Sequence, residues 1–452
     1  MQSINPATGQ VIKQYPEHHL WECQDILLRV DKAWKSWKST SFSERAALTK
    51  RVGQALLAHQ DQYAQLITQE MGKIIKTARA EVEKCAFICD YYADNAEAML
   101  ADEAIPLESG RSFVSFEPIG VVLGIMPWNF PFWQVCRYAV PALIAGNACV
   151  LKHASNVPGC ALALEEVFRQ AGFPEDIFRT LLIPGSQVEP LIGHEVIKGV
   201  ALTGSEKAGS QVAAAAGRHL KKTVMELGGT DPFVVLEDAD FDLCCTLAVK
   251  ARMQNAGQTC IAAKRFIVLE KVAAAFEARH KQLVENLVVG DPLKEETNLG
   301  PLARADLREQ LHQQVQDSIK MGARLVTGGK SLDGPGFYYT PTILAEVKKG
   351  MPVYDQETFG PVSALITVKD EEEAIAVAND SPYGLGGSIW TRDLKRGERL
   401  ARRIESGTVV VNTMTKSDPR LPFGGVKRSG YGREMSHYGI KEFVNIKTIY
   451  IA

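Results

Sequence analysis

The chain alternates short apolar segments with turns and helical segments, and it does so in two separate runs. The first run extends from Val121 to Asp240, and its apolar segments end in Gly, Pro, Asn or Ser. Such alternation is typical of βαβ units and a parallel sheet. A second run of the same kind extends from Arg265 to Asn412. The sequence therefore predicts two α/β domains, and a length of 452 residues exceeds what one core usually organises.

Two further segments have a different character. Leu20 to Met99 has apolar residues at helical spacing and few Gly or Pro interruptions, which predicts an N-terminal helical layer. Arg111 to Glu117 alternates apolar and polar residues and is ended by Pro118 and Gly120. This pattern is typical of an exposed strand or hairpin arm, which we expect to serve a partner subunit.

Composition and charge argue against several classes of protein. A formal net charge of −2 argues against nucleic acid as an obligatory partner, because phosphate binding normally requires a basic excess. No secretory signal segment or membrane-spanning stretch is evident, so we expect a cytoplasmic chain. Nine cysteines without a repeated spacing predict free thiols rather than a disulfide framework, and no metal-binding spacing is present. We therefore expect no metal.

Cys260 is the first candidate for chemistry. It ends the segment Asn255-Ala-Gly-Gln-Thr-Cys260, in which a Gly-containing turn can expose the sulfur to a pocket. Thiols are strong nucleophiles, and attack on an aldehyde gives a thiohemiacetal whose hydride can then leave. The alternative is a buried structural cysteine, which is the commoner case for a lone thiol.

Glu226 is a candidate general base. It precedes Leu227, Gly228 and Gly229 at the end of an apolar element. A carboxylate there can activate the thiol or a hydrolytic water. A cap or an ordinary ion pair is the alternative, but paired glycines indicate close approach of the backbone to a ligand or another segment.

Asn129 lies in the rigid loop from Met126 to Pro131. Two prolines fix that backbone, and the Asn129 amide together with the backbone N–H of Cys260 can form an oxyanion hole. An ordinary turn remains the alternative.

The segment Thr203-Gly204-Ser205, with Gly209 following, lies between an apolar strand and a helix. Backbone N–H groups at such a helix start suit a pyrophosphate, although a tight turn explains the pattern equally well. Lys152 and Ser155 follow the preceding strand and can reach an adenosine ribose.

Taken together and in this order, these elements resemble the aldehyde dehydrogenase superfamily over nearly the whole chain. The resemblance rests on Pro127-Trp-Asn-Phe-Pro131, the Lys152 segment, Gly204-Ser205, Glu226-Leu-Gly-Gly, Gly257-Gln-Thr-Cys260, Glu357-Thr-Phe-Gly-Pro361, Asn379 to Leu385, and Pro422-Phe-Gly-Gly with Ser429-Gly-Tyr-Gly-Arg-Glu434.

This resemblance implies a Rossmann-like cofactor-binding domain over 1–228, an α/β catalytic domain over 229–421, and a return to the cofactor domain over 422–452. A β oligomerisation arm is implied near 105–119 and at the C-terminal strand near Phe443 to Tyr450, in a homodimer or homotetramer. Cys260 would be the nucleophile, Glu226 the base and Asn129 an oxyanion donor. The residues implied to bind NAD or NADP are Pro127, Trp128, Lys152, Ser155, Gly185, Gly204, Ser205, Gly209, Leu227, Glu357 and Phe359.

Within the superfamily the chain resembles short-type bacterial succinate-semialdehyde dehydrogenases. Trp133, Arg137 and Ser417 are implied to border the aldehyde tunnel, where a cation and a hydroxyl suit a remote carboxylate. An ordinary ion pair is the alternative for Arg137. Another semialdehyde or a simple aliphatic aldehyde is the alternative substrate, and a non-catalytic family member is the alternative from another class.

Two positions bear on coenzyme choice. NAD-preferring members often have Glu where Ser155 stands, and that carboxylate repels a 2′-phosphate. Ser155 lacks this repulsion, so we expect NADP to be accepted. His153 replaces the Pro that is more usual in the family, which leaves the local loop geometry open. Ala262 occupies the position where some members have a second cysteine, so no local disulfide switch is expected.

Overall fold

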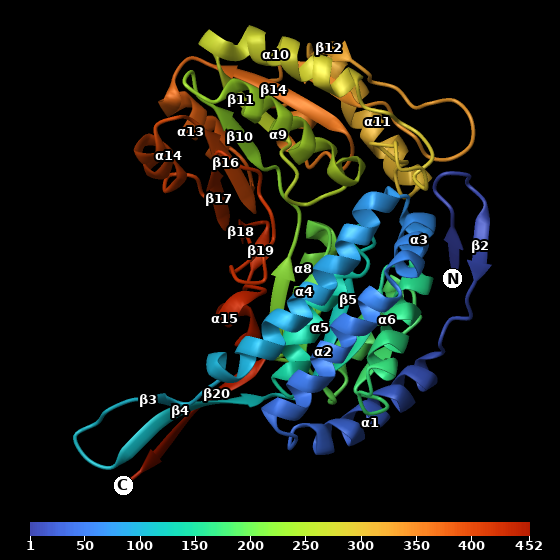
Figure 1. Ribbon diagram of the computed structural model, residues 1–452, viewed down its shortest axis with the longest axis vertical. Helices are drawn as coiled ribbons and strands as arrows, with labels where there is room; N and C mark the ends of the chain where they lie inside the picture. The colour runs from blue at the N-terminus through green and yellow to red at the C-terminus, as the bar shows by residue number, and fades with distance from the viewer.

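The computed structural model describes residues 1–452, which form two sheet-centred units and a projecting arm (Figure 1). The first sheet has six strands in the order β19-β9-β8-β5-β6-β7. Its strands are β5 (Val121–Met126), β6 (Ala148–His153), β7 (Phe178–Thr180), β8 (Ile197–Thr203), β9 (Lys222–Glu226) and β19 (Gly430–Tyr431). The first five are parallel, and only the short β19 runs antiparallel, at the β9 edge.

The strand order locates the ligand crevice of this sheet. Counted along the chain, the five parallel strands lie in the order 3-2-1-4-5, which is that of a dinucleotide-binding half. The order reverses between β5 and β8, so the crevice is expected where those two strands end. The loop after β5 contains Asn129, and the turn after β8 contains Gly204 and Ser205.

Helices cover both faces of the first sheet. The predicted N-terminal helical layer is confirmed as four helices: α1 (Leu20–Trp37), α2 (Phe42–Ala58), α3 (Gln60–Met71) and α4 (Ile75–Met99). The helices between the strands are α5 (Trp133–Ile144), α6 (Pro158–Gln170), α7 (Val188–Gly193) and α8 (Glu206–Arg218), with the 3-10 turn η1 (Gly185–Gln187). Helix α4 packs against α2, α3 and α5, which ties the helical layer to the loop that follows β5.

The second sheet has seven strands in the order β12-β13-β14-β11-β10-β16-β17, and only β12 runs antiparallel to its neighbour. Its strands are β10 (Pro232–Val235), β11 (Arg265–Leu269), β12 (Arg324–Thr327), β13 (Thr342–Ala345), β14 (Val362–Val368), β16 (Gly386–Trp390) and β17 (Thr408–Val411). Its helices are α9 (Phe241–Met253), η2 (Gln254–Gly257), α10 (Glu270–Glu285), α11 (Ala305–Lys320), α12 (Pro352–Asp355), α13 (Glu371–Asn379) and α14 (Leu394–Ala401). Each sheet has its own hydrophobic core, and the chain passes from the first to the second between Glu226 and Pro232.

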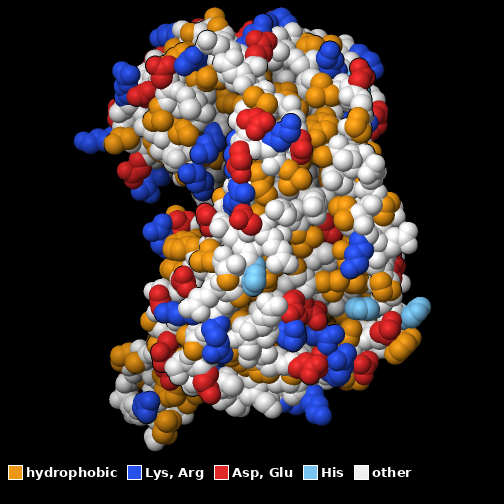
Figure 2. All heavy atoms as spheres, turned by 45° about the vertical axis from the view of Figure 1, so that its right-hand side comes forward, with side chains coloured by type: hydrophobic (Ala, Val, Ile, Leu, Met, Phe, Trp, Pro, Cys, Tyr) orange, Lys and Arg blue, Asp and Glu red, His pale blue; other side chains and the backbone are white.

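The arm is a three-stranded sheet of β3 (Glu103–Ala104), β4 (Arg111–Pro118) and β20 (Val444–Ile451). Strands β4 and β20 pair antiparallel along their whole length, so the two segments predicted to share the arm do so. The arm projects from the body of the molecule (Figure 1), and hydrophobic side chains lie on its surface (Figure 2). They include Ile446, 60% exposed, and Ile451, 51% exposed.

The remaining elements are short. They are β1 (Gln2–Ile4), β2 (Val11–Gln14), β15 (Tyr383–Gly384), β18 (Val426–Lys427) and α15 (Ser436–Ile440). No helix combines the length and the hydropathy needed to cross a bilayer. On the face in Figure 2, basic and acidic side chains are interspersed rather than gathered by sign.

A buried carboxylate fixes the start of α5. Glu81 on α4 accepts hydrogen bonds from the backbone N–H groups of Phe132, at 2.9 Å, and Trp133, at 3.0 Å. Its other oxygen pairs with Lys73, whose ammonium lies 3.6 Å from the centroid of the Phe130 ring. A negative charge at a helix N-terminus is favourable, and here it also compensates a buried cation. The loop carrying Asn129 is therefore anchored from α4.

We predict that Glu81→Ala destabilises the first unit by about 3–5 kcal/mol, because Lys73 would remain buried without a counter-charge. The effect should appear as an earlier first transition in urea unfolding followed by tryptophan fluorescence. Glu83→Ala, on the exposed face of the same helix, is the matched control and should change stability by less than about 0.5 kcal/mol. Equal transitions for the two variants would contradict the anchoring role.

Candidate active site

Cys260 follows a turn that few sequences can form. The backbone of Asn255, Ala256 and Gly257 is left-handed, with φ of 55°, 53° and 74°. A Cβ on Gly257 would overlap the carbonyl of Gly360, so glycine is required there for contact as well as conformation. Three consecutive left-handed residues cost energy and are typical of functional sites. The turn ends α9 and leaves Cys260 half-buried.

The loops of Cys260 and Asn129 are joined by amide hydrogen bonds. Asn255 Nδ2 donates to the carbonyl oxygens of Asn129, at 2.8 Å, and Gln258, at 3.2 Å. Asn129 Nδ2 donates to the same Gln258 oxygen at 3.0 Å. Gln258 Oε1 in turn accepts from the backbone of Ala303 at 2.9 Å. Asn129 is thus held beside the turn that leads to the cysteine. Sequence reasoning had not assigned a role to the Asn255 or Gln258 side chains.

Cys260 differs from the other eight cysteines, all of which are buried. Burial raises the pKa of the Cys260 thiol to about 11, against the opposing positive charges of Arg137 and Lys264. The thiol is therefore protonated at neutral pH, and nucleophilic attack requires a proton acceptor. The alternative of an inert core cysteine does not fit a side chain that lines a large cavity.

Glu226 lies at the end of β9, 2% exposed, with neither carboxylate oxygen hydrogen-bonded. Burial, followed by the charge of Glu434, raises the pKa of Glu226 well above its usual range. A raised pKa makes a carboxylate a better proton acceptor. In the structure the carboxylate lies against Gly424, where a Cβ would come within 2.7 Å of Oε1, and Glu226 is not among the residues that line the cavity containing Cys260. The base role stays a prediction.

A cavity of about 550 Å³ lies at the strand ends where the crevice was expected. Nine of the residues predicted for catalysis and cofactor binding line it: Pro127, Trp128, Asn129, Gly204, Ser205, Leu227, Cys260, Glu357 and Phe359. The rings of Trp128 and Phe359 meet edge to face, with centroids 5.8 Å apart. The sequence analysis missed Gln134, Thr203, Glu206, Lys207, Leu307, Gln310, Gln314, Gln356 and Tyr383. Gln310 and Gln314 on α11 could not be recognised as cavity residues from the sequence, because polar residues on an amphipathic helix are ordinarily solvated.

Four predicted cofactor residues lie outside this cavity. Lys152 is the penultimate residue of β6, is 8% exposed and has its pKa lowered by burial. Ser155 is exposed in the following turn, and Gly185 is exposed at the start of η1. Gly209 has a packing role, since a Cβ on it would overlap the Leu227 side chain, which does line the cavity. The binding roles of these four residues stay predictions.

Glu357 is held in place by Gly229, which precedes Cys260 in the chain, and by Lys264, which follows it. Its Oε1 pairs with Lys264 at 3.0 Å and accepts from the backbone N–H of Gly229 at 3.1 Å. Lys264 also donates to the carbonyl of Cys260 at 2.5 Å. A Cβ on Gly228 would lie 2.5 Å from Glu357 Oε2, and one on Gly229 would lie 3.2 Å from the Cys260 carbonyl oxygen. The glycine pair therefore permits close approach, as predicted, while Lys264 was missed.

His153 is neutral and supports the Asn129 loop. Burial lowers the pKa of its imidazole to about 4. Nδ1 accepts from the backbone N–H of Ala154 at 2.9 Å, which leaves Nε2 to donate to the carbonyl of Pro131 at 2.8 Å. The residue thus bridges the end of β6 to the Asn129 loop, a link that the more usual proline could not make.

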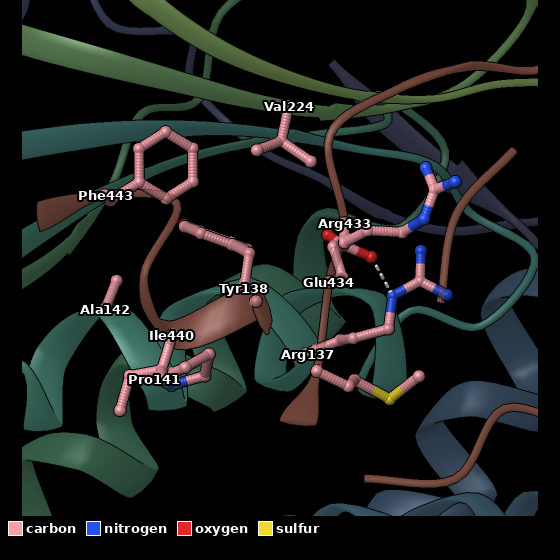
Figure 3. A pocket seen from close by; sticks show the side chains of 11 residues that line it. Arg137, Tyr138, Pro141, Ala142, Val224, Arg433, Glu434, Ile440 and Phe443 are labelled. Carbon is pink, nitrogen blue, oxygen red and sulfur yellow. Dashed lines mark ion pairs between the residues drawn. The ribbon is translucent and has the colours of Figure 1, made fainter. Parts of the chain in front are cut away.

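Arg137 is held beside the site by an ion pair. Its guanidinium, which was predicted to project into the aldehyde tunnel, is 2% exposed and pairs with Glu434 (Figure 3). Its role in substrate binding stays a prediction. It also donates to Thr203 Oγ1 at 3.2 Å and lies 4.7 Å from the centroid of the Phe423 ring. The ordinary ion pair, which was the alternative, describes its principal contact. The charge still acts on the site, because it opposes the rise in the Cys260 pKa.

Trp133 and Ser417, which were predicted to border the aldehyde tunnel, both contact Lys84, and neither is among the residues that line the cavity containing Cys260. Lys84 on α4 donates to Ser417 Oγ at 2.6 Å and lies 4.1 Å from the centroid of the Trp133 ring. Trp133 is 3% exposed, and Ser417 is half-buried.

Comparison with known proteins identifies the class. Residues 1–449 match the model of the Aldehyde dehydrogenase family. The chain is 51% identical over 450 residues to a Synechocystis protein named probable succinate-semialdehyde dehydrogenase (NADP+), covering 100% of this chain and 99% of that one. It is 46% identical to an Escherichia coli K12 protein named succinate semialdehyde dehydrogenase (NAD(P)+), covering 99% and 97%. The chain belongs to the aldehyde dehydrogenase family, which confirms the resemblance noted in the sequence.

Solved structures agree with this assignment. A crystal structure of succinic semialdehyde dehydrogenase from Streptococcus pyogenes in complex with NADP+ superimposes with a TM-score of 0.98 at 41% identity, covering 100% of this chain and 99% of that one. The expected fold of two α/β units is confirmed.

We predict that iodoacetamide modifies one cysteine per chain in the folded protein, and that peptide mass mapping locates it at Cys260. The rate should rise about tenfold per pH unit from pH 7 to 9, because the thiolate fraction grows in that proportion below the pKa. Cys260→Ser, the matched control, should take up no label. Labelling of a second cysteine at a comparable rate, or a plateau below pH 8, would contradict the environment described.

Proposed function

We propose that the protein oxidises succinate semialdehyde to succinate with NADP or NAD as hydride acceptor. The observation that carries the proposal is that Cys260 and Asn129 share the wall of the cavity at the crevice of the first sheet. Near full-length identity to relatives named as succinate-semialdehyde dehydrogenases supports the choice of aldehyde.

The chain's own residues supply the covalent chemistry. Cys260 gives its proton to Glu226, and the thiolate attacks the aldehyde carbon to form a thiohemiacetal. Asn129 Nδ2 and the Cys260 backbone N–H donate to the oxyanion that develops, and each such donor is typically worth about 2.7–4 kcal/mol. Loss of hydride leaves a thioester on Cys260. Glu226 releases the first proton to solvent before hydrolysis. Water then gives a proton to Glu226 and attacks the thioester, and collapse of the tetrahedral adduct releases the acid and the Cys260 thiolate. The proton on Glu226 returns to that thiolate and restores the thiol.

The cavity fits a nicotinamide dinucleotide. It opens at the N-terminus of α8, where Ser205 caps the helix and backbone N–H groups face the crevice, as a pyrophosphate requires. Lys152 and Ser155 would hold the adenosine ribose, and Glu357 with Phe359 would hold the nicotinamide end. When bound, the nicotinamide supplies the hydride acceptor.

The proposal extends to assembly and location. The apolar side chains of the arm would be covered by a partner subunit in a homodimer or homotetramer, because exposed apolar patches of this kind mark interaction sites. A cytoplasmic location accords with cysteines that are all free.

Initial rates with succinate semialdehyde and propanal, each with NAD and with NADP, test the proposal. We expect kcat/KM for succinate semialdehyde to exceed that for propanal at least tenfold, a difference of about 1.4 kcal/mol in transition-state binding. Cys260→Ser is the control and should form no reduced coenzyme. A preference for propanal or for a longer semialdehyde would assign the protein another aldehyde. Absence of activity in folded protein would favour the non-catalytic alternative.

We also predict that Ser155→Glu lowers kcat/KM for NADP about 10- to 100-fold while NAD is retained, because the new carboxylate would repel the 2′-phosphate. The measurement is the ratio of kcat/KM values with the two coenzymes. Ser155→Ala separates loss of the hydroxyl from the added charge and should leave that ratio nearly unchanged. An equal decrease with both coenzymes would place the ribose elsewhere.

A further inference from the structure

Lys264 lies just outside the cavity and uses all three of its ammonium hydrogens. It immediately precedes β11, and its backbone N–H donates to the carbonyl of Asp231 at 3.0 Å. Its side chain is 1% exposed and does not line the cavity that contains Cys260. The ammonium donates to the carbonyl oxygens of Thr259, at 3.1 Å, and Cys260, at 2.5 Å. It also pairs with Glu357 Oε1 at 3.0 Å, so no donor is left for another partner.

The contact with Thr259 is important because of the peptide group to which that carbonyl belongs. The carbonyl of Thr259 and the N–H of Cys260 are the two ends of one peptide group, which is planar and trans. A bond that fixes the direction of the carbonyl therefore also fixes the direction of the N–H. The structure contains no hydrogen bond from this N–H to another group of the chain. The N–H is thus available for the oxyanion that forms when the thiol attacks an aldehyde.

The lysine also affects the strength of this donor. A hydrogen bond accepted by a peptide carbonyl draws electron density toward the oxygen and leaves the N–H of the same peptide more positive. A charged donor has a larger effect than a neutral one. The same ammonium holds the next carbonyl, that of Cys260, so the backbone is fixed on both sides of the residue that carries the thiol.

The third contact of Lys264 connects this peptide to the coenzyme side of the cavity. Glu357 lines the cavity together with Cys260. Lys264 and the backbone N–H of Gly229 both bond Oε1 of Glu357, and no hydrogen bond to Oε2 is formed within the chain. Oε2 is therefore free for a ligand group. Lys264 contacts the oxyanion peptide and the residue assigned to the nicotinamide end at the same time.

Two simpler roles of Lys264 must be separated from this one. Lys264 pairs with Glu357, and its charge opposes the rise in the pKa of the Cys260 thiol. Either role requires only a positive charge near its partner. Neither role requires a hydrogen bond to the Thr259 carbonyl, which is the contact specific to the oxyanion peptide.

We propose that Lys264 is a positioning residue that orients and polarises the Thr259–Cys260 peptide, so that its N–H is a stronger donor to the oxyanion. This inference rests on the proposed oxidation of an aldehyde, because that reaction forms the oxyanion. It adds a third residue to the oxyanion site, one that acts through the backbone and does not touch the substrate.

The test compares two rates in Lys264→Met. The first is kcat/KM for succinate semialdehyde at saturating NADP, and the second is the rate of Cys260 alkylation by iodoacetamide at pH 8. Alkylation displaces iodide and develops no oxyanion, so it reports only the thiolate and its access. We expect kcat/KM to fall about tenfold more than the alkylation rate, which is less than the loss of a whole oxyanion donor. Lys271→Met, exposed on α10, is the matched control and should change neither rate.

The Glu357→Gln background separates the peptide from the ion pair. If Lys264 acted through Glu357 alone, Lys264→Met would have no further effect in that background. We expect kcat/KM to fall about tenfold further in Lys264→Met/Glu357→Gln than in Glu357→Gln. The double variant removes both charges of the pair, so it keeps the comparison usable if Lys264→Met alone does not fold.

The outcomes separate this inference from the proposed function. Equal losses in kcat/KM and alkylation rate would overturn the inference, because Lys264 would then act only on the thiolate. No further loss in the Glu357→Gln background would overturn it as well, because the ion pair would then account for the whole effect. A wild-type preference for another aldehyde would revise the proposed substrate alone, and the same comparison is then made with that aldehyde. A folded wild-type protein that oxidises no aldehyde would overturn both proposals.

Discussion

The geometry of the active site depends on the side-chain amide of Asn255. Asn255 Nδ2 bonds the carbonyl oxygens of Asn129 and Gln258, and those two residues belong to loops from different sheets. That bridge, together with the direct hydrogen bond from Asn129 Nδ2 to the Gln258 carbonyl, holds the oxyanion donor in register with the nucleophile. The bridge requires the left-handed backbone at 255–257, which in turn requires Gly257 against the Gly360 carbonyl. Catalytic geometry of this kind needs sub-ångström positioning, and buried hydrogen bonds from side-chain amides provide it.

The sequence could predict those parts of the fold and site that depend on residues close together in the chain. Apolar segments between turns identified β5, β8 and β11, and the glycines beside Glu226 and Cys260 indicated close backbone approach. The partner of Arg137 could not be found from the sequence, because Glu434 comes from the far end of the chain and nothing near either residue reports the pairing. The contact between Lys84 and Ser417 was not predicted for a related reason, since a single lysine on an amphipathic helix has the same local pattern as a solvated one. Gly209 was predicted to bind the cofactor, and the structure adds that it makes room for Leu227.

The site combines a protonated thiol with a carboxyl group whose pKa is raised. Burial raises the pKa of both Cys260 and Glu226, so each group favours its protonated, uncharged form. The rise at Glu226 makes its carboxylate a stronger proton acceptor, whereas the rise at Cys260 makes its thiol a weaker acid. Arg137 limits both shifts at once, because its positive charge stabilises the thiolate and the carboxylate. An ion pair with Glu434 keeps that charge in place, which gives Arg137 an electrostatic role even without direct contact with substrate.

Buried cations around the site differ in how their charge is balanced. Lys73 is compensated by Glu81, Arg137 by Glu434 and Lys264 by Glu357. Arg252 is fully buried without a carboxylate partner and donates to the backbone carbonyls of Thr358 and Gly360 instead. Lys152 has neither kind of partner, and burial lowers its pKa. A buried cation without a counter-charge is costly, so a coenzyme phosphate bound beside Lys152, as proposed, would remove part of that cost.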